Sequence, residues 1–438
     1  MTERQYKGSG IEWIGDIPND WDVKRIKYAV VEMGSGTTPS SDNSHFYGGD
    51  IPWIQSGDLY NTPLITKTSK TVTEQAFQSC SALKIFHKPY IVIAMYGASV
   101  GNVSMSLIDA CTNQACCVIK PNANNNLAYL KYWLEICKTD FINKSVGGGQ
   151  PNISQDKIRE QAYICPSLEE QQQIADFLDS KTASIDSAIQ AQKDIVEKLK
   201  EYRQSVITEA VTKGLNRDAE MKESKTNGVD KIPATWEDMK IKYLCSFCNG
   251  LTYHPEDICG EDEGTLVLRS SNIQNGKLNF NDNVYVKCSI PTKIRVKKGD
   301  IIICSRNGSA KLIGKNALVT NDMNATFGAF MMMFRCDSPR YMYYVLNSKT
   351  WETYLSLFAT TTINQLTSTT FGNLLFPYTF DKEEQCRIVE YLDSKTATID
   401  KAIEQKNAII EKLEEYKKSI IYNAVTGKID CRKDVIPE

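Results

Sequence analysis

Two cysteines at a zinc-ligand spacing are the first residues that could do chemistry. The stretch "CSFC" at 245–248 holds two thiols separated by two residues, and His254 and Cys259 follow. Thiolate and imidazole ligands at such spacings are typical of tetrahedral zinc sites. The chain repeats this region earlier, and there Val30 and Met33 stand in place of the two cysteines. Because apolar side chains fill the equivalent places, we interpret the cysteines as core residues and expect no metal site.

A second stretch resembles a phosphate-binding loop. The segment "GSAKLIGKN" at 308–316 has the glycines and the lysine of such a loop, but its glycines are one residue too far apart. Asn316 also stands where a Ser or Thr would bind magnesium. The histidines His45, His87 and His254 form no catalytic cluster in the sequence, and we find no methylation motif, glycine-rich cofactor loop or helicase motif. We therefore expect a chain that is not an enzyme and that holds no cofactor.

Polar side chains in predicted turns could recognise base edges by hydrogen bonding. Arg pairs with two acceptors of guanine, and Asn or Gln pairs with a donor and an acceptor of adenine. The alternative for each residue is a turn-forming role, since Ser, Thr and Asn routinely bind nearby backbone groups. We favour Arg269, Arg306 and Gln150 among them. The candidates in the first half of the chain are Thr37, Thr38, Ser40, Gln55, Ser56, Tyr96, Ser99, Gln150 and Asn152. Those in the second half are Thr252, Tyr253, Arg269, Ser271, Asn272, Arg306, Asn307, Ser309, Asn364 and Gln365.

Basic side chains are candidates for contacts with a phosphate backbone. The overall charge gives this idea little support, because 51 Lys and Arg against 53 Asp and Glu leave a net charge of −2. DNA-binding domains are usually basic. One set of candidates, for which a solvated strand face is the alternative, comprises Lys24, Arg25, Lys27, Lys240 and Lys242. A denser cluster in the second half comprises Lys293, Arg295, Lys297, Lys298, Lys311 and Lys315.

Two long helices of repeated sequence must position these side chains. The stretch "LDSKTASID" at Leu178–Asp186 returns as "LDSKTATID" at Leu392–Asp400. The similarity extends over about 45 residues in each copy without an internal Pro or Gly, which predicts one helix at 167–213 and another at 381–427.

Both predicted helices begin with a capping-box pattern. The pairs are Ser167 with Glu170 and Asp381 with Glu384. Chain connectivity predicts that the helices run antiparallel. The first helix ends where the second half of the chain begins, and the second helix starts where that half ends. If each half sits on its own helix in the same way, the two helices must point in opposite directions.

Apolar residues at seven-residue intervals predict a coiled-coil seam along both helices. On the first helix we expect Ala188, Ile195 and Tyr202 to lie in the seam between these regularly spaced apolar residues. Gln192 and Lys406 interrupt the two seams at equivalent positions, and antiparallel pairing is expected to bring them opposite each other. The predicted seam comprises Leu178, Ile185, Gln192, Leu199, Val206, Leu392, Ile399, Lys406, Leu413 and Ile420.

The segments in front of the helices are also duplicated. The stretch "IPNDWDVKRIKY" at Ile17–Tyr28 matches "IPATWEDMKIKY" at Ile232–Tyr243. Residues 90–103 and 300–314 share a strand, a turn of small residues and a further strand. Between these landmarks the two segments diverge strongly. A common scaffold with different loops is typical of domains whose binding specificity lies in the loops.

These motifs together resemble those of a known family. They are "EEQ" with "LDSKT" in each helix, "IPxxW" before each domain, "GSGTTPS" at Gly34–Ser40, "IPWIQSGDL" at Ile51–Leu59 and "LRSSNI" at Leu268–Ile273. The chain resembles, over essentially its whole length, the specificity subunits of type I restriction-modification systems. The resemblance implies two target-recognition domains that read the halves of a bipartite, asymmetric site in double-stranded DNA. It also implies that the helices dock two methyltransferase subunits, which bind S-adenosylmethionine and methylate adenine, and that a restriction subunit with motor and nuclease activity joins the complex.

The expected fold class is therefore α+β, with two β-rich target-recognition domains that contain helices. Two long helices separate them and form an intramolecular antiparallel coiled coil with pseudo-two-fold, circular symmetry. The expected divisions are target-recognition domain 1 at 1–166, a spacer helix at 167–213, a linker at 214–228, target-recognition domain 2 at 229–380, a second spacer helix at 381–427 and a C-terminal tail at 428–438.

The expected location is the cytoplasm, because the sequence shows no secretion signal and no apolar run of membrane length. The fourteen cysteines are then expected to be reduced. Two other functions stay open at this point. One is a coiled-coil scaffold whose β-rich domains bind proteins without DNA readout. The other is an enzyme with unrecognised catalytic residues.

Overall fold

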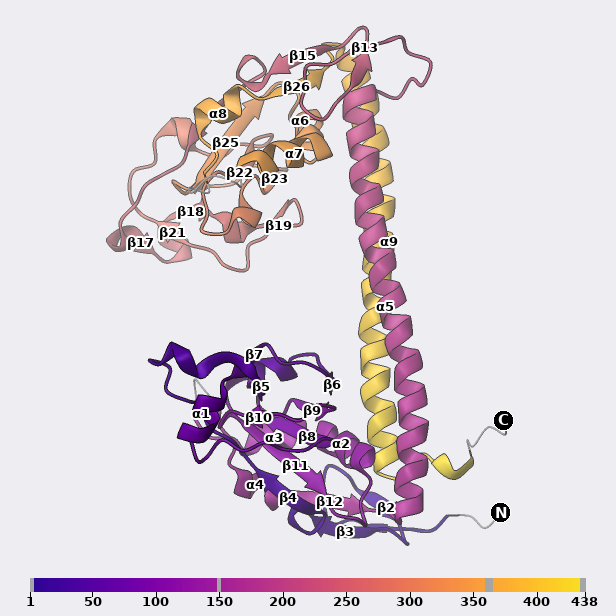
Figure 1. Cartoon of the computed structure of the whole chain (residues 1–438). Coiled ribbons are helices and arrows are strands. Elements are labelled where there is room, and N and C mark those ends of the chain that lie inside the picture. Colours follow the sequence, from indigo (N-terminus) through magenta and orange to yellow (C-terminus); the bar gives the residue numbers. More distant parts are fainter. Residues whose placement is uncertain (1–3, 148–150, 359–364, 434–438) are drawn as a thin grey trace. The chain divides into compact units, whose positions relative to one another are not determined.

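The chain folds into two compact units that share the two long helices. The structure is a computed structural model that describes residues 4–147, 151–358 and 365–433. Unit 1 comprises Met1–Gln192 and Ile409–Glu438, and unit 2 comprises Lys193–Ala408 (Figure 1). Each long helix thus contributes one part to each unit, whereas the sequence-based division set the helices apart from the domains.

Unit 1 is built around a sheet whose central strand is fully covered. Strand β8 (Tyr90–Ala94) reads "YIVIA" and is buried along its whole length. A continuous apolar run is typical of a strand that is covered on both faces. The strand order is β4-β11-β8-β9-β6, with bounds β4 (Val30–Gly34), β11 (Cys116–Pro121), β9 (Val103–Ser106) and β6 (Leu64–Ile65).

A second sheet of unit 1 positions the loop that follows β5 (Tyr47–Ile54). Strand β7 (Lys70–Val72) pairs with β5 antiparallel, and β10 (Cys111–Thr112) pairs with it in parallel. The other elements of unit 1 are β1 (Tyr6–Gly8), β2 (Asp16–Pro18), β3 (Asp22–Arg25), β12 (Ala162–Cys165), α1 (Glu74–Ser79), α2 (Leu127–Ile136), α3 (Lys138–Lys144) and α4 (Gln155–Arg159).

Unit 2 repeats this plan. Its first sheet has the order β16-β25-β22-β23, with β16 (Cys245–Asn249), β25 (Met331–Cys336), β22 (Ile301–Cys304) and β23 (Asn316–Leu318). Its second has the order β17-β21-β18-β24, with β17 (Ile258–Cys259), β21 (Tyr285–Val286), β18 (Thr265–Leu268) and β24 (Ala325–Phe327). As in unit 1, one pair of this sheet, β18 with β24, is parallel. The other elements are β13 (Met221–Glu223), β14 (Lys231–Pro233), β15 (Glu237–Lys240), β19 (Ile273–Gln274), β20 (Lys277–Leu278), β26 (Leu375–Tyr378), α6 (Pro339–Val345), α7 (Lys349–Phe358) and α8 (Ser368–Gly372).

The two long helices run antiparallel within each unit. They are α5 (Leu168–Lys213) and α9 (Lys382–Val425). In unit 1 the start of α5 lies beside the end of α9, because Tyr129 Oη lies 3.0 Å from the carbonyl oxygen of Ile164, four residues before α5, and 3.2 Å from that of Val425. In unit 2 the end of α5 meets the start of α9, where Gly214 lies against the side chain of Glu384.

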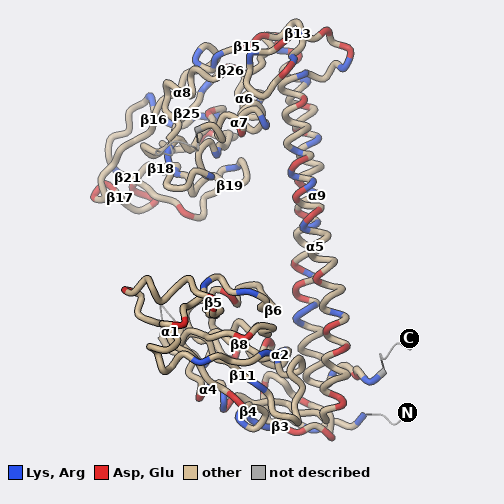
Figure 2. Tube along the Cα trace, viewed as in Figure 1, with Lys and Arg blue, Asp and Glu red and all other residues tan. Residues whose placement is uncertain are grey.

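The same ion pair occurs once in each unit. Lys417 Nζ lies 2.7 Å from Asp186 Oδ2 in unit 1, and Arg203 Nε lies 2.8 Å from Asp400 Oδ1 in unit 2. Each residue of the first pair is the repeat equivalent of one in the second. Figure 2 shows Lys and Arg alternating with Asp and Glu along both helices. Because these pairs are partly exposed, each contributes little to stability.

The seam follows alternating four- and three-residue steps, and this corrects one of our expectations. Leu178, Ile185 and Val206 are buried as expected, but Ile195 and Tyr202 are 37% and 55% exposed. The places that we assigned to Ala188, Ile195 and Tyr202 are taken by the next residues, Ile189, Val196 and Arg203, and Thr182 and Ala210 continue the same phase. The sequence is ambiguous because adjacent apolar pairs such as Ile195 and Val196 offer both phases.

The remaining predicted seam residues differ in how far their side chains are buried. Leu392, Ile399 and Ile420 are buried, and Gln192, Leu199, Lys406 and Leu413 are half-buried. Gln192 Oε1 is buried without a hydrogen-bond partner among the described residues. Gln192 belongs to unit 1 and Lys406 to unit 2, so the expected apposition of the two stays a prediction.

The helix starts form only half of the expected capping boxes. The backbone N–H of Glu170 donates to Ser167 Oγ at 3.2 Å, and that of Glu384 donates to Asp381 Oδ1 at 3.3 Å. The reciprocal half is replaced, because the carboxylate of Glu170 binds Arg4 at 2.6 Å and that of Glu384 binds Thr379 at 2.8 Å. A glutamate at this position can either cap its own helix or bind another element, and the sequence pattern does not distinguish the two.

Among the described residues, none of the helices combines the length and the apolar character needed to cross a membrane.

Candidate nucleic-acid interface

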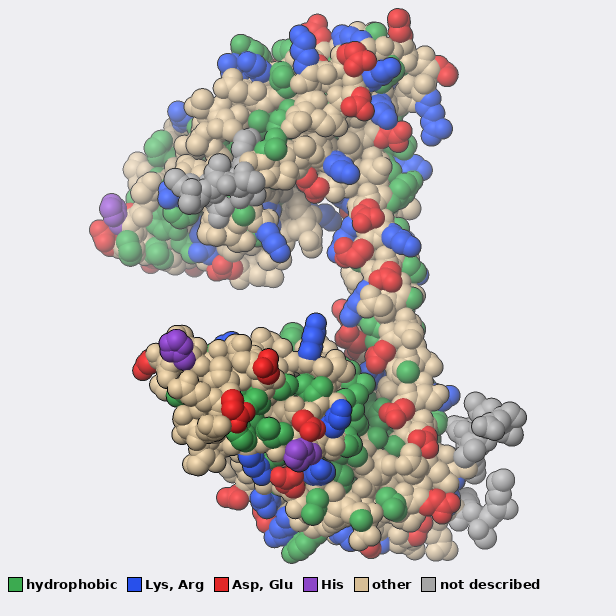
Figure 3. Space-filling view, in the orientation of Figure 1, with side chains coloured by type: hydrophobic (Ala, Val, Ile, Leu, Met, Phe, Trp, Pro, Cys, Tyr) green, Lys and Arg blue, Asp and Glu red, His purple; other side chains and the backbone are tan. Residues whose placement is uncertain are grey.

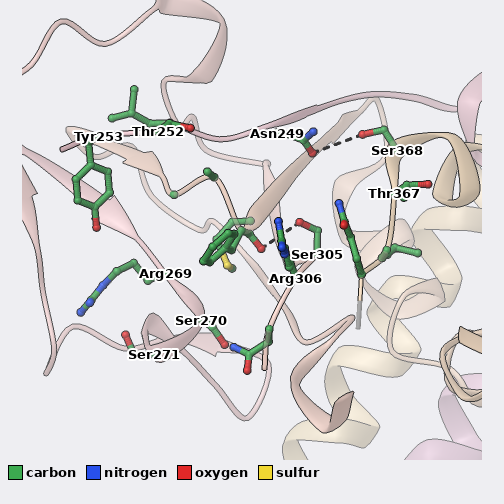
Figure 4. Close-up of a pocket in the computed structure, with 18 residues that line it drawn as sticks. Asn249, Thr252, Tyr253, Arg269, Ser270, Ser271, Ser305, Arg306, Thr367 and Ser368 are labelled. Atoms are coloured by element: carbon green, nitrogen blue, oxygen red, sulfur yellow. Dashed lines mark hydrogen bonds between the residues drawn. The ribbon is translucent and has the colours of Figure 1, made fainter. Parts of the chain in front are cut away.

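The loops of unit 2 enclose a cavity of about 860 Å³ at one end of its strands (Figure 4). Segments that follow β16, β18, β22 and β24 line it. Most base-readout candidates of this half of the chain lie here: Thr252, Tyr253, Arg269, Ser271, Arg306, Asn307 and Gln365. The fold therefore brings together polar side chains that are more than a hundred residues apart in the sequence.

Arg269 stands at the turn that follows β18. Its backbone N–H donates to Asn272 Oδ1 at 2.9 Å, which closes the turn. Its Nη2 contacts both the backbone oxygen of Asp282, at 3.0 Å, and the carboxylate of Asp282, at 2.9 Å. Lys315 Nζ donates to the carbonyl of Ser270 at 3.3 Å and holds the same turn from the other side. The guanidinium is thus directed by its neighbours, and the side chain remains one-third exposed.

Arg306 is exposed in the loop cluster and stacks on an aromatic ring. Its guanidinium carbon is 5.3 Å from the centre of the Phe330 ring, and the Phe330 side chain is 60% exposed. Such a cation–π contact restricts the arginine without using its N–H groups. The backbone of Arg306 forms a bridge with Gln365, which places these two candidates side by side. Figure 3 shows basic and hydrophobic side chains next to each other on the left of unit 2.

One candidate in unit 2 is corrected by the structure. Asn272 is fully buried, and its Nδ2 donates to the carbonyls of Asn279 and Asp282, each at 3.1 Å. It shapes the turn and is not placed to touch a ligand. Ser309 is exposed and its backbone N–H binds Asn307 Oδ1 at 3.0 Å, outside the cavity lining. Asn364 lies outside the described residues.

Unit 1 has its own cavity, of about 560 Å³. Thr38 and Gln55 line it, together with the aromatic side chains of Tyr47 and Trp53. Thr38 Oγ1 donates to Gln114 Oε1 at 2.5 Å. The side-chain amide of Gln114 is thus held beside Thr38, in addition to the amide of Gln55 in the cavity lining. Polar groups beside aromatic faces suit a ligand with a planar ring and hydrogen-bonding edges.

The other candidates of unit 1 surround two neighbouring loops. The carbonyl of Thr37 accepts a bond of 3.2 Å from Trp53 Nε1, and Ser99 Oγ donates to the carbonyl of Tyr96 at 2.9 Å. Tyr96 is 39% exposed and bridges to Asn152 through the backbone. Ser40 is exposed and Ser56 half-buried in the loops next to Thr38 and Gln55, and Gln150 lies outside the described residues.

The two units place different side chains at equivalent backbone positions. Tyr96 bridges to Asn152 in unit 1 as Arg306 bridges to Gln365 in unit 2. In each case the first residue follows the central strand, β8 or β22, by two positions. A shared frame with exchanged side chains is what two readers of different sequences require.

The basic candidates divide into two groups. Lys24, Arg25 and Lys240 stand on β3 and β15, which lie across their units from β5 and β18 (Figure 1). Lys27 and Lys242 stand in the short helical turns that follow these strands, and several of the five have partners within the chain. Lys24 lies 3.4 Å from Asp22, Arg25 and Lys27 both contact Glu160, and Lys242 donates to Asn373. Lys240 is half-buried. These positions favour the solvated strand face that we kept as the alternative.

The second basic group is exposed and open to a ligand. Lys293, Arg295, Lys297 and Lys298 are exposed, and none of them forms an ion pair with another described residue. Lys311 is exposed as well. Lys315 is half-buried, and its Nζ donates to the carbonyl of Ser270 in the turn that carries Arg269. Its primary role is therefore structural.

The structure also bears on zinc chemistry at Cys245 and Cys248. Both stand on β16, and desolvation by burial raises the pKa of each thiol. Zinc needs thiolates, which this environment disfavours. Among the residues that the structure describes, no group of three or more His, Cys, Asp or Glu side chains could hold a metal ion.

Sequence reasoning missed Phe330 and Asp282. Phe330 lies in the apolar run "AFMMMF" at 329–334, which predicts a buried strand, and only the tertiary structure shows that the strand begins one residue later. Asp282 is thirteen residues from Arg269, and no local pattern links the two. A search for exposed aromatic residues next to predicted strand ends could have found Phe330.

The chain is similar to proteins described as specificity subunits of type I restriction enzymes. Residues 18–198 match the family described as "Type I restriction modification DNA specificity domain". The chain is 35% identical over 190 residues to the MjaIX specificity subunit of a type I restriction enzyme from Methanocaldococcus jannaschii. That match covers 42% of this chain and 43% of the relative, so the chain spans less than half the length of that protein.

Two longer matches extend over nearly the whole chain. The MjaVIII specificity subunit of the same organism is 24% identical over 427 residues, which cover 94% of each protein. A solved chain from a study of complex assembly and conformational transition of the type I R-M system has a TM-score of 0.71 at 14% identity. It covers 94% of this chain and 99% of its own length, and it supports the fold.

Proposed function

Because the chain belongs to the family of type I restriction-modification specificity subunits, we propose that it is the DNA-reading subunit of such a complex. Each unit reads one half of a bipartite, asymmetric site in double-stranded DNA. The chain itself carries out no chemistry and holds no cofactor. It directs two methyltransferase subunits, which use S-adenosylmethionine, and a restriction subunit.

The observation that carries this proposal is the pair of loop clusters on a repeated frame. Both clusters gather side chains able to form paired hydrogen bonds with base edges. Because the frames agree and the side chains differ, we expect the two half-sites to differ in sequence. The exposed basic group of unit 2 supplies contacts with phosphates.

The helices supply the rest of the proposed role. An antiparallel pair built from two copies of one sequence presents the same surface to two copies of one partner, which agrees with two methyltransferase subunits. A spacer of helical structure would also set the number of base pairs between the half-sites. We propose the cytoplasm, where the chromosome of a prokaryotic cell lies, as the place of action.

The test is to map methylated adenines by single-molecule sequencing in cells that express this chain with its methyltransferase. Cells that lack only this chain are the control. A split, asymmetric motif that depends on the chain is the expected result. If the complex assembles and the methyltransferase is active, but no motif depends on the chain, the proposal fails and a scaffold without DNA readout is the better account.

A further inference from the structure

Gln55 and Arg269 occupy the same backbone position in the two units. Gln55 follows β5 and Arg269 follows β18 directly. The last residue of each strand pairs in parallel with the last residue of an equivalent short strand, Ile54 with Thr112 and Leu268 with Phe327. The two side chains therefore leave the same point of the shared frame.

The turns that carry them are closed in the same way. The backbone N–H of Gln55 donates to Asp58 Oδ2 at 2.8 Å, as that of Arg269 donates to Asn272 Oδ1 at 2.9 Å. Asp58 is held in turn by the backbone N–H of Ser69, at 2.9 Å. Since a side-chain acceptor three residues later closes both turns, the backbone directions at the two positions agree.

Both side chains face the loop cavity of their own unit. Gln55 is half-buried in the cavity of unit 1, and Arg269 lines the cavity of unit 2 (Figure 4). The contacts between Arg269 and Asp282 use Nη2. The N–H groups of Nη1 are not engaged by Asp282, and the buried Nε has no partner among the described residues. The guanidinium is thus oriented by Asp282, and the N–H groups of Nη1 are the donors that stay available.

We propose that these two residues read the equivalent base pair of the two half-sites, Gln55 an A·T pair and Arg269 a G·C pair. The assignment rests on the proposed function. A carboxamide matches the donor and acceptor that adenine presents in the major groove, and a guanidinium matches the two acceptors of guanine. If Arg269 contacted phosphate instead, its replacement would weaken binding to all sequences alike.

The experiment exchanges the two side chains in the full chain within the assembled methyltransferase complex. Methylated adenines are mapped in cells that carry Gln55→Arg or Arg269→Gln. Gln75→Arg adds the same charge on the exposed helix α1 of unit 1, and Arg217→Gln removes one from an exposed position of unit 2. Both controls lie outside the two loop cavities and should keep the wild-type motif.

The expected result is a change at one base pair in one half-site for each variant, from A·T to G·C for Gln55→Arg and the reverse for Arg269→Gln. The other half-site should stay unchanged. Variants that assemble and keep the wild-type base at every position overturn the inference. Absence of any chain-dependent motif with the wild-type chain is a separate result and overturns the proposed function as well.

If an exchanged side chain blocks methylation altogether, alanine substitutions at the same two positions still test the inference. Gln55→Ala and Arg269→Ala keep the turns, because the closing bonds use the backbone N–H. Binding of the purified complex to duplexes with each base at each half-site position should show discrimination reduced by about 10-fold at one base pair. Unchanged discrimination at every position counts against the inference.

Discussion

Trp21 Nε1 donates a hydrogen bond of 2.7 Å to Glu170 Oε2, although 149 residues separate the two. The tryptophan closes the "IPxxW" motif and the glutamate belongs to the "EEQ" motif at the start of α5. Unit 2 repeats the bond between Trp236 and Glu384 at 2.9 Å. The two sequence motifs therefore form one joint, which ties the first strands of each unit to the beginning of its long helix.

Trp21→Phe should destabilise unit 1 by about 1–3 kcal/mol, because the buried Glu170 carboxylate loses a donor. Trp21 is 1% exposed, and Arg4 remains as the other partner of the carboxylate. Urea unfolding followed by circular dichroism measures the effect. Trp13→Phe is the matched control, since Trp13 is 37% exposed. Equal midpoints for the two variants would show that the joint contributes little.

Gly250→Ala should disturb the loop cluster of unit 2. A Cβ at this position would overlap the carbonyl oxygen of Phe327, which is backbone and cannot turn away. We expect a loss of site-specific methylation with the helical content of the chain preserved. Gly260→Ala is the control in the same unit, because a Cβ there meets no atom within 4 Å. The two variants are compared by methylation mapping and circular dichroism, and a wild-type motif with Gly250→Ala would contradict the prediction.

Arg306→Lys should relax base discrimination in the half-site that unit 2 reads. Lysine keeps the charge but loses the planar fork and the stacking on Phe330. We expect discrimination at one base pair to fall about 10-fold or more, with little change in binding to unrelated DNA. Fluorescence anisotropy with cognate and single-substituted duplexes measures this ratio.

Arg295→Gln provides the contrast to Arg306→Lys, because Arg295 belongs to the exposed basic group. Its loss should weaken binding to all duplexes alike and reduce the slope of log K against log salt by about 1. If Arg295→Gln alters base preference while Arg306→Lys leaves it intact, the roles of the two arginines are reversed.

Asp238→Asn should reduce the acid sensitivity of unit 2. Desolvation acts to raise the pKa of Asp238, but bonds from the backbone of Lys225 and from Thr226 and Ser224 outweigh it and hold the pKa below the ordinary 3.8. A carboxyl group with a lowered folded-state pKa contributes stability above pH about 4 that is lost as the pH falls through that lowered value. Urea unfolding between pH 6 and pH 3 measures this loss. Asp230→Asn, at an exposed position nearby, is the control and should keep the wild-type slope.

Long helices and the duplicated frame could be predicted because they depend on local sequence. An uninterrupted repeat with helical periodicity specifies a helix wherever it packs, and α5 and α9 lie within two residues of the predicted bounds. The phase of the seam could not be predicted in full. Adjacent apolar residues make both phases compatible with the sequence, and packing in the structure buries Val196 and leaves Ile195 37% exposed.

The sequence by itself determined that the chain has two related halves, where its long helices run and which polar turn residues are candidates for recognition. Only the tertiary structure decided which of these residues meet. Arg269, Arg306 and Gln365 line one cavity because the segments that follow β18 and β22, strands of two different sheets, come together there, whereas Asn272 is turned inward to close a turn. Pairing between distant strands is a non-local choice, and one linear pattern of polar residues is compatible with both outcomes.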